Sequence, residues 1–100
     1  MTTFAGTREG QVYFLRRTSD QAIKIGWSKD PLQRQSEVER RAATDVDLIA
    51  TFPAQRAVEY ALHQRFASER LDGEWFASHD RLEEAVELVR LFWDSHDCRR

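Results

Sequence analysis

Two residues that could take part in acid–base or phosphate chemistry, Tyr13 and Lys24, lie in neighbouring apolar runs and are separated by ten residues. The turn-forming segment 18–20 stands between the runs, so the pattern predicts a β-hairpin over residues 11–26. With a symmetric link, Tyr13 would lie directly opposite Lys24, at a Cβ separation of about 5 Å. A phenol and an ammonium would then share one face of the sheet, while apolar side chains occupy the other (Phe14, Ile23 and Ile25). Core packing does not explain that polar pair well, so the hairpin is interpreted as a site.

A third candidate, Arg34, follows in a predicted helix. Asp30 is expected to be the N-cap of this helix and Pro31 its first residue, and the helix should run to about Ala43. Arg34 precedes Val38 by four residues and therefore borders the thin apolar face. Helical phase alone favours an ordinary surface arginine, which remains the alternative to a phosphate-binding residue.

A carboxylate and an imidazole lie one turn apart on the next predicted helix. Glu59 projects at the margin of an apolar face, near Leu62 and Phe66. A carboxylate at the edge of a core is costly unless it is paired or binds a cation. His63 offers a simpler alternative, a Glu–His helical pair that contributes roughly a few tenths of a kcal/mol. Glu74 is a weaker candidate, because the segment GEWF is interpreted as a core anchor whose carboxylate faces out.

Periodicity and turn signals predict the elements that position these residues. Beyond the hairpin and the first helix, residues 46–52 alternate as a third strand. Two helices are expected after it, one over residues 54–71 and one from Ser78 or Asp80, where Asp80 and Glu83 would form a capping box. The fold class is therefore predicted as α+β: a small three-stranded, mainly antiparallel sheet flanked by three helices, in the order ββαβαα.

Length and composition define the class of protein. The chain has 100 residues, of which 41% are hydrophobic and 32% are charged, values typical of one soluble globular domain. We expect residues 1–10 to be frayed, residues 11–95 to form the domain and residues 96–100 to be a C-terminal tail. No apolar run is long enough for a membrane span, and the first residues lack the features of a signal peptide. The single cysteine, Cys98, fits a reducing cytoplasm.

Charge is spread unevenly along the chain. The net charge of −2 argues against a protein that coats nucleic acid by bulk electrostatics. Residues 1–56 carry nine Lys and Arg against seven Asp and Glu, whereas residues 57–100 carry six against ten. A polyanion is therefore expected to approach the N-terminal half.

In combination, these motifs resemble those of the GIY-YIG nuclease superfamily, which is named for two tripeptides on adjacent strands. Gln11-Val12-Tyr13 stands in the place of GIY, and Lys24-Ile25-Gly26 stands in the place of YIG. Arg34 matches the family's helix arginine, and Glu59 matches its metal-binding glutamate. The further patterns IKIG, SKDPxxR, ExxLHxxF and GEWF are similar to a compact branch found in phages and some microbial proteins. The resemblance covers about residues 11–92.

Two positions depart from the family pattern. Gln11 replaces the first glycine, although Gly10 precedes it. Lys24 replaces the second tyrosine and so removes a hydroxyl that many members place in the active site. Lysine is usual in the branch that this chain resembles, and that branch is less clearly catalytic than the homing and repair nucleases.

The resemblance implies a site in which Glu59 holds one Mg²⁺ or Mn²⁺ ion. Tyr13 would orient or deprotonate the attacking water, and Lys24 would lower the pKa of this phenol from its free value of about 10. Arg34 would hold the non-bridging phosphate oxygens. His63 would relay a proton or contact phosphate, unless it serves helix packing alone. The implied catalytic residues are Tyr13, Lys24, Arg34, Glu59 and His63, and the implied substrate-binding residues are Lys24, Lys29 and Arg34.

The leading interpretation is a metal-dependent nuclease that hydrolyses phosphodiester bonds in DNA. Two alternatives stay open: a non-catalytic nucleic-acid-binding module, and a phage accessory protein that binds partners through its acidic C-terminal half. Retention of Tyr13 and Glu59 favours the enzyme, because a pure binder gains nothing from a carboxylate that faces phosphate. So small a unit would dimerise, rely on a partner protein or cut with low specificity. We expect Tyr13, Lys24, Arg34 and Glu59 to converge on one concave surface.

Overall fold

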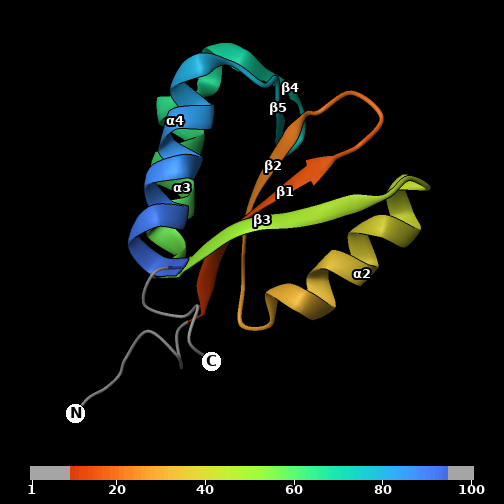
Figure 1. Cartoon of the computed structure of the whole chain (residues 1–100), viewed down its shortest axis with the longest axis horizontal. Helices are drawn as coiled ribbons and strands as arrows, with labels where there is room; N and C mark the ends of the chain where they lie inside the picture. Colours follow the sequence, from red (N-terminus) through yellow and green to blue (C-terminus); the bar gives the residue numbers. More distant parts are fainter. Residues whose placement is uncertain (1–9, 95–100) are drawn as a thin grey trace.

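The computed structural model describes residues 10–94, in which one antiparallel sheet lies between helices (Figure 1). Along the chain, the strands are β1 (Gln11–Arg17), β2 (Ile23–Ser28), β3 (Val46–Pro53), β4 (Arg70–Asp72) and β5 (Trp75–Phe76). The helices are α2 (Pro31–Ala42), α3 (Arg56–Arg65) and α4 (Asp80–Val89), with a 3-10 turn η1 (Ala67–Glu69) and a π-helical turn η2 (Arg90–Asp94). No helix of the described part is long and apolar enough to cross a membrane.

The predicted three-stranded sheet is wrong, because the described residues form five strands in the spatial order β3-β1-β2-β5-β4. The additional strands, β4 and β5, begin where the second helix was expected to continue to residue 71. Instead α3 ends at Arg65, and η1 leads into a second hairpin around Gly73. Gly73 has a φ of +55°, a left-handed conformation that glycine adopts at little cost. The order of elements is therefore ββαβαββα rather than ββαβαα.

The first hairpin is present, but its register differs from the expected one. Tyr13 pairs with Gly26 and not with Lys24. The turn causes this shift, because the loop closes at the residues 17 and 22, and Gln21 takes a left-handed φ of 68°. A shift of two residues leaves every side chain on the same face of the sheet. Tyr13 and Lys24 therefore share a face, as predicted, although they are diagonal neighbours.

Alternation along β1 and β2 supplies a core on each side of the sheet. One face packs under α3 and α4, and its buried residues include Val12, Phe14, Ile23, Ile25, Phe66, Phe76, Leu82 and Val86. The other packs under α2 and consists of Tyr13, Leu15, Val38 and Val46. Burying one large apolar side chain stabilises a fold by about 1.5–3 kcal/mol, so both layers hold the sheet firmly. The site residues are thus attached to a scaffold with helices on both faces.

Of the two helix caps predicted from the sequence, one is confirmed and one is wrong. The Asp30 side chain accepts a hydrogen bond from the Gln33 N–H at 3.2 Å, and Pro31 begins α2, which confirms the predicted cap. The predicted capping box of Asp80 and Glu83 is wrong, because His79 is the N-cap of α4 and gives no side-chain hydrogen bond. The Glu83 carboxylate is instead bound by a guanidinium from β1.

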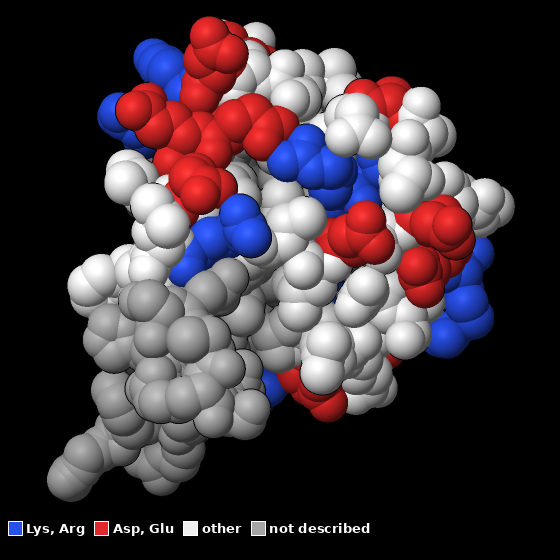
Figure 2. All heavy atoms as spheres, viewed as in Figure 1, with Lys and Arg blue, Asp and Glu red and all other residues white. Residues whose placement is uncertain are grey.

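Acidic side chains gather over α4 on the face shown in Figure 2, and basic groups elsewhere on this face lie among acidic ones. The acidic residues of α4 are Asp80, Glu83, Glu84 and Glu87. This face therefore offers no continuous basic surface to a polyanion. The division into residues 1–10, 11–95 and 96–100 stays a prediction: residues 1–9 and 95–100 lie outside the described part, and Gly10 is buried.

Candidate metal and phosphate site

At the centre of the candidate site, the ring of Tyr13 lies over Gly26 on the neighbouring strand. A Cβ atom at Gly26 would be 2.3 Å from both the Cζ and the hydroxyl oxygen of Tyr13, so only glycine leaves room for the phenol. The Tyr13 side chain is fully buried, and its hydroxyl makes no hydrogen bond of ordinary geometry to residues 10–93, although the Arg34 guanidinium is close enough to lower its pKa. A buried polar group without a partner costs about 1–3 kcal/mol. A ligand, ion or water that reaches this hydroxyl would complete its hydrogen bonding.

Burial raises the pKa of Tyr13 to about 12, against the partial opposition of the Arg34 charge; the Glu74 and Glu59 carboxylates raise it further. The expected effect of Lys24 is therefore wrong: the cation that favours the phenolate is Arg34, and burial outweighs it. Lys24 Nζ instead donates to Glu74 Oε1 at 2.7 Å. With no metal bound, Tyr13 is consequently neutral at pH 7 and can donate a hydrogen bond.

Three potential metal ligands gather beside Tyr13. Glu59, His63 and Glu74 each offer one ligand atom, and these atoms lie within 4.8 Å of one another. Helix α3 delivers the first two from one side, because residues four apart lie on the same face of a helix. The turn before β5 delivers Glu74. Glu59 is buried, with 8% of its surface exposed, and it is the buried residue of a helix whose other side chains are at least partly exposed.

The electrostatics of this group favour a cation. Burial raises the pKa of Glu59, and the nearby Glu74 carboxylate raises it further, while the charges of His63 and Arg56 act in the opposite direction. Two carboxylates that approach each other in a desolvated place repel when both are ionised. A divalent cation would remove that repulsion, and oxygen ligands suit Mg²⁺ and Mn²⁺. The donor set therefore fits a hard metal ion.

The edge of β2 fixes the orientation of two members of the group. His63 Nε2 lies 2.8 Å from the Ile25 carbonyl oxygen, and the Ile25 N–H donates to the Glu74 carbonyl at 3.1 Å. Because a carbonyl only accepts, Nε2 carries the proton of this hydrogen bond. The same Nε2 lies 3.8 Å from Glu59 Oε2, so the Glu–His helical pair is present, and this nitrogen could ligate a metal only after its bond to Ile25 breaks. The carboxylates of Glu59 and Glu74 are the readier ligands.

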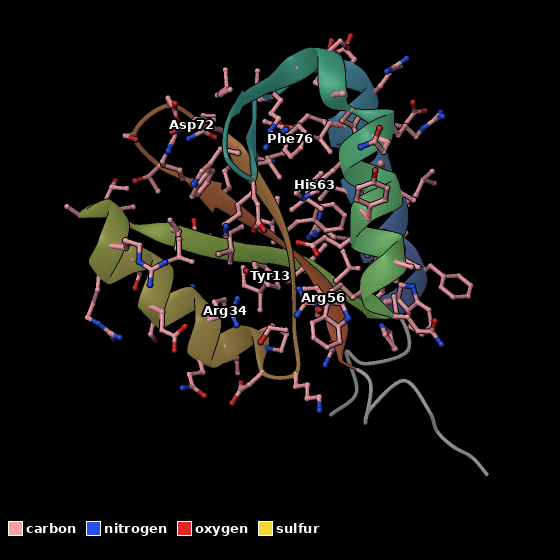
Figure 3. All side chains as sticks on the ribbon, turned by 180° about the vertical axis from the view of Figure 1, so that it is seen from behind. Tyr13, Arg34, Arg56, His63, Asp72 and Phe76 are labelled. Carbon is pink, nitrogen blue, oxygen red and sulfur yellow. The ribbon has the colours of Figure 1, made fainter. Side chains whose placement is uncertain are left out.

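The structure brings most of the predicted residues together. Tyr13 and Arg34 lie close to each other in Figure 3, with the side chain of His63 beyond them on α3. Glu59 is close enough to Tyr13 to influence its pKa, and Lys24 joins the group through Glu74. Lys29, in the connection between β2 and α2, is exposed. The concavity of this surface stays a prediction.

Sequence reasoning underrated one residue and missed another. Glu74 was interpreted as facing out from a core anchor, whereas its carboxylate joins the group of potential metal ligands. Its position directly after Gly73 could have suggested a turn that aims it back at the sheet. Arg56, the first residue of α3, was not considered, although it lies close enough to Glu59 to influence the pKa of that carboxyl. Neither residue could be placed without β5 and the start of α3.

Comparison with known proteins gives one family. The model of the T5orf172 domain matches residues 10–93. This domain is found in phage and microbial nuclease-like proteins. Neither the curated proteins nor the solved structures that were searched gave a match. The matched span begins before β1 and ends in η2, so it contains every residue of the candidate site.

Proposed function

The chain belongs to the T5orf172 domain family, and from this premise we propose that it is a metal-dependent nuclease of the GIY-YIG type that hydrolyses phosphodiester bonds in DNA. One observation carries the proposal: Glu59, His63 and Glu74 gather beside a buried phenol whose hydroxyl is without a partner in the described part. The resemblance of the two hairpin tripeptides to GIY and YIG supports the same assignment.

The metal site of the proposed enzyme consists of the Glu59 and Glu74 carboxylates, with His63 at their side. A bound Mg²⁺ or Mn²⁺ ion would neutralise charge on the phosphate and make a bound water more acidic. Glu59 suits this role because burial and a second carboxylate disfavour its ionised form when no cation is present. His63 supports the site by holding its imidazole against the edge of β2.

Phosphate binding falls to the cations around the carboxylates. Arg34 has a planar guanidinium that can bind two phosphate oxygens at once. It is partly exposed, and its ion pair with Glu37 is 3.1 Å long and lies on the surface of α2. A surface pair of this kind contributes little, so a phosphate can displace it. Lys29, exposed at the start of α2, adds a second point of attraction for the DNA backbone.

Tyr13 and Lys24 have positioning roles. The neutral Tyr13 hydroxyl would donate a hydrogen bond to a water or phosphate oxygen in the cluster, which fixes the reacting group without removing its proton. Lys24 Nζ holds the Glu74 carboxylate at 2.7 Å and also lies 5.9 Å from the centre of the Trp75 ring. Lysine in place of the second tyrosine thus orients a metal ligand, a role that a tyrosine hydroxyl could fill only as a neutral donor.

A cleavage assay tests the proposal. Plasmid, single-stranded and branched DNA are incubated with the protein in Mg²⁺, in Mn²⁺ and in a chelator. We expect metal-dependent cleavage that Glu59→Gln abolishes and that Glu87→Gln leaves intact. Glu87 is a matched control, because its exposed carboxylate pairs with Arg90 on the surface of α4. Cleavage that survives in chelator, or in Glu59→Gln, would overturn the proposal.

One observation favours the non-catalytic alternative, a DNA-binding module. The Lys24–Glu74 ion pair already neutralises one of the two carboxylates, so the fold can exist without a metal. Metal titration separates the two functions. A nuclease should gain thermal stability on addition of Mn²⁺, because a ligand that binds only the folded state stabilises it, and Glu59→Gln should remove the gain. A pure binder would bind DNA without any metal-induced change in stability.

A further inference from the structure

We propose that Arg56, stacked on the ring of Trp27, binds a backbone phosphate of the DNA on the α3 side of the candidate site. This inference rests on the proposed function, because it names a contact to the same substrate. In Figure 3 Arg56 and Arg34 are drawn on either side of Tyr13, one from α3 and the other from α2. The two guanidiniums would hold the DNA backbone on both sides of the metal ligands.

Trp27 is a fixed platform. It follows Gly26 on β2, and its indole Nε1–H donates to the Ala54 carbonyl at 2.8 Å. The ring also packs against Gly10, where a Cβ atom would lie 2.5 Å from Trp27 Cζ2. A hydrogen bond at one end of the ring and backbone against it leave the indole little freedom to move. A cation stacked on this ring is therefore held at a defined position.

The guanidinium of Arg56 is the cation stacked on Trp27, with its Cζ 4.6 Å from the centre of the ring. Stacking on an aromatic face orients a guanidinium and leaves its edge N–H donors free for an anion. Arg56 is exposed, and none of residues 10–93 supplies a carboxylate within 4.0 Å of it. Its charge lowers the pKa of Glu59, which places it within electrostatic reach of the metal ligands.

A second arginine–tryptophan stack shows what a purely structural pair looks like. Arg17 lies 4.3 Å from the centre of the Trp75 ring, a distance close to that of the first stack. Its guanidinium, however, binds the Asp20 carboxylate through two hydrogen bonds of 2.9 Å. That arginine is neutralised within the hairpin, whereas Arg56 lies at a similar distance from its ring and has no carboxylate partner among residues 10–93. The difference indicates an anionic ligand for Arg56.

The ligand is a phosphate and not a nucleobase. A guanidinium binds anionic oxygens through its planar fork, and that of Arg56 already covers a face of Trp27 on which a base could otherwise stack. The cation adds one positive charge beside two carboxylates that would otherwise repel DNA. Binding of a single phosphate by one arginine is independent of base sequence and is weakened by salt.

Equilibrium binding tests this contact without requiring cleavage. A fluorescein-labelled DNA duplex is titrated with the full chain in chelator, at several salt concentrations, and anisotropy is recorded. Arg56→Gln should weaken binding several-fold. It should also make the negative slope of log K against log salt shallower by about 0.9, the value for one lost phosphate contact. Arg56→Lys keeps the charge but not the planar stack, so it should fall between Arg56→Gln and the native protein.

Arg65→Gln is the matched control. Arg65 is an exposed arginine on the same helix, and nine residues correspond to about two and a half turns, so it points away from the site. It lines a separate cavity between α3 and α4. Affinity and salt slope should not change in this variant.

The outcomes separate the two proposals. If the protein binds and cleaves DNA but Arg56→Gln behaves like Arg65→Gln, the phosphate contact is wrong and the nuclease stands. If Arg56→Gln lowers the affinity and the slope but no metal supports cleavage, the contact stands and the nuclease is wrong. A native protein that does not bind DNA would overturn both.

Discussion

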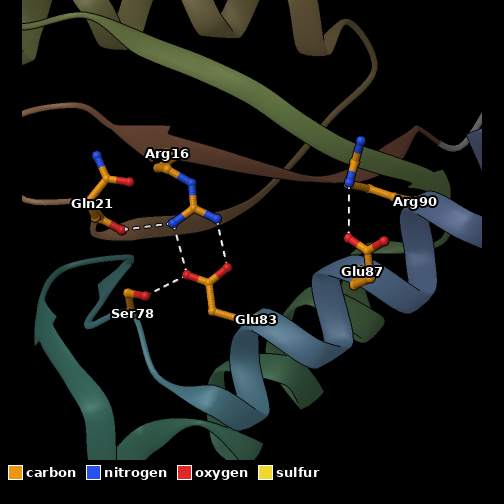
Figure 4. A network of polar contacts seen from close by, with 6 residues as sticks. All are labelled: Arg16, Gln21, Ser78, Glu83, Glu87 and Arg90. Carbon is orange, nitrogen blue, oxygen red and sulfur yellow. Dashed lines mark hydrogen bonds and ion pairs between the residues drawn. The ribbon is translucent and has the colours of Figure 1, made fainter.

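Two polar clusters join a helix to the first hairpin of this fold, and they are built on opposite electrostatic principles. At the α4 side, Arg16 binds the Glu83 carboxylate through two hydrogen bonds of 2.8 and 2.7 Å, and Ser78 donates to the same carboxylate (Figure 4). Hydrogen bonding to Arg16 lowers the pKa of Glu83. At the α3 side, Glu59 approaches Glu74, and burial raises its pKa.

The contrast indicates that the Glu83 cluster stabilises the fold, whereas the Glu59 cluster is suited to bind a ligand. In the Glu83 cluster both carboxylate oxygens of Glu83 accept hydrogen bonds from within the chain (Figure 4). In the Glu59 cluster, a carboxylate is desolvated beside a like charge, and the adjacent Tyr13 hydroxyl has no partner among residues 10–94. Natural proteins retain such unfavourable local arrangements mainly at functional sites.

The largest expected effect comes from Glu59→Gln. Loss of the charge that holds the metal should reduce cleavage about 100-fold or more. The free energy of unfolding should stay the same or rise slightly at pH 7, because the amide does not repel Glu74. Cleavage rates and urea unfolding on the same preparation check both parts. A marked loss of stability would show that Glu59, like Glu83, mainly stabilises the fold.

Gly26→Ala should have the next largest effect. The new Cβ would collide with the Tyr13 ring, and overpacking of this kind costs about 1–3 kcal/mol. The backbone at Gly26 is not left-handed, so relief of the collision should restore most of the stability. The measurement is a double-mutant cycle with Tyr13→Leu, which lacks the atoms that collide. Additive effects of the two substitutions would contradict the proposed contact.

A smaller effect is expected from Glu83→Gln. Its ion pair with Arg16 has side-chain exposures of 22% and 35%, so solvent screens part of the interaction. We expect a loss of about 1 kcal/mol in the free energy of unfolding, after allowance for that screening. Cleavage by the folded variant should equal that of the native protein. An activity loss as large as that of Glu59→Gln would erase the distinction between the clusters.

The smallest effects are in the dependence of stability on pH. The pKa of Glu59 is raised in the folded state, so its contribution is full below its unfolded pKa and is lost as pH rises through the folded value. The pKa of Glu83 is lowered, so its contribution is present above its unfolded pKa and is lost as pH falls. Unfolding free energies of the native protein minus those of each Gln variant, between about pH 3 and about pH 7, should therefore slope in opposite directions.

Local signals in the sequence predicted the first hairpin, the Asp30 cap of α2 and the strand β3, because turn formers, a proline and alternation each act over a few residues. The same signals failed at β4 and β5. Those strands are only three and two residues long, too short for periodicity to register. Their pairing depends on β2, which lies far away in the sequence.

The candidate site was predictable to the extent that it depends on faces and motifs. Tyr13 and Lys24 share a face despite the wrong register, since strand side chains alternate with a period of two. The partners of Lys24 could not be predicted, because Glu74 reaches it only through the second hairpin. Burial decides the pKa of Tyr13, and burial is a property of the packed layers rather than of the sequence near the residue.

The hydrogen bonds of Ile25 have a consequence for self-association. Strand β5 pairs with β2 only at Ile23 and Lys24, so the rest of β2 would present an open edge. An open strand edge is a template on which another chain can add a strand and start aggregation. His63 and the Glu74 backbone occupy both polar groups of Ile25, and α3 lies along this stretch. Residues of the candidate site therefore also keep the backbone groups of Ile25 from pairing with a strand of another chain.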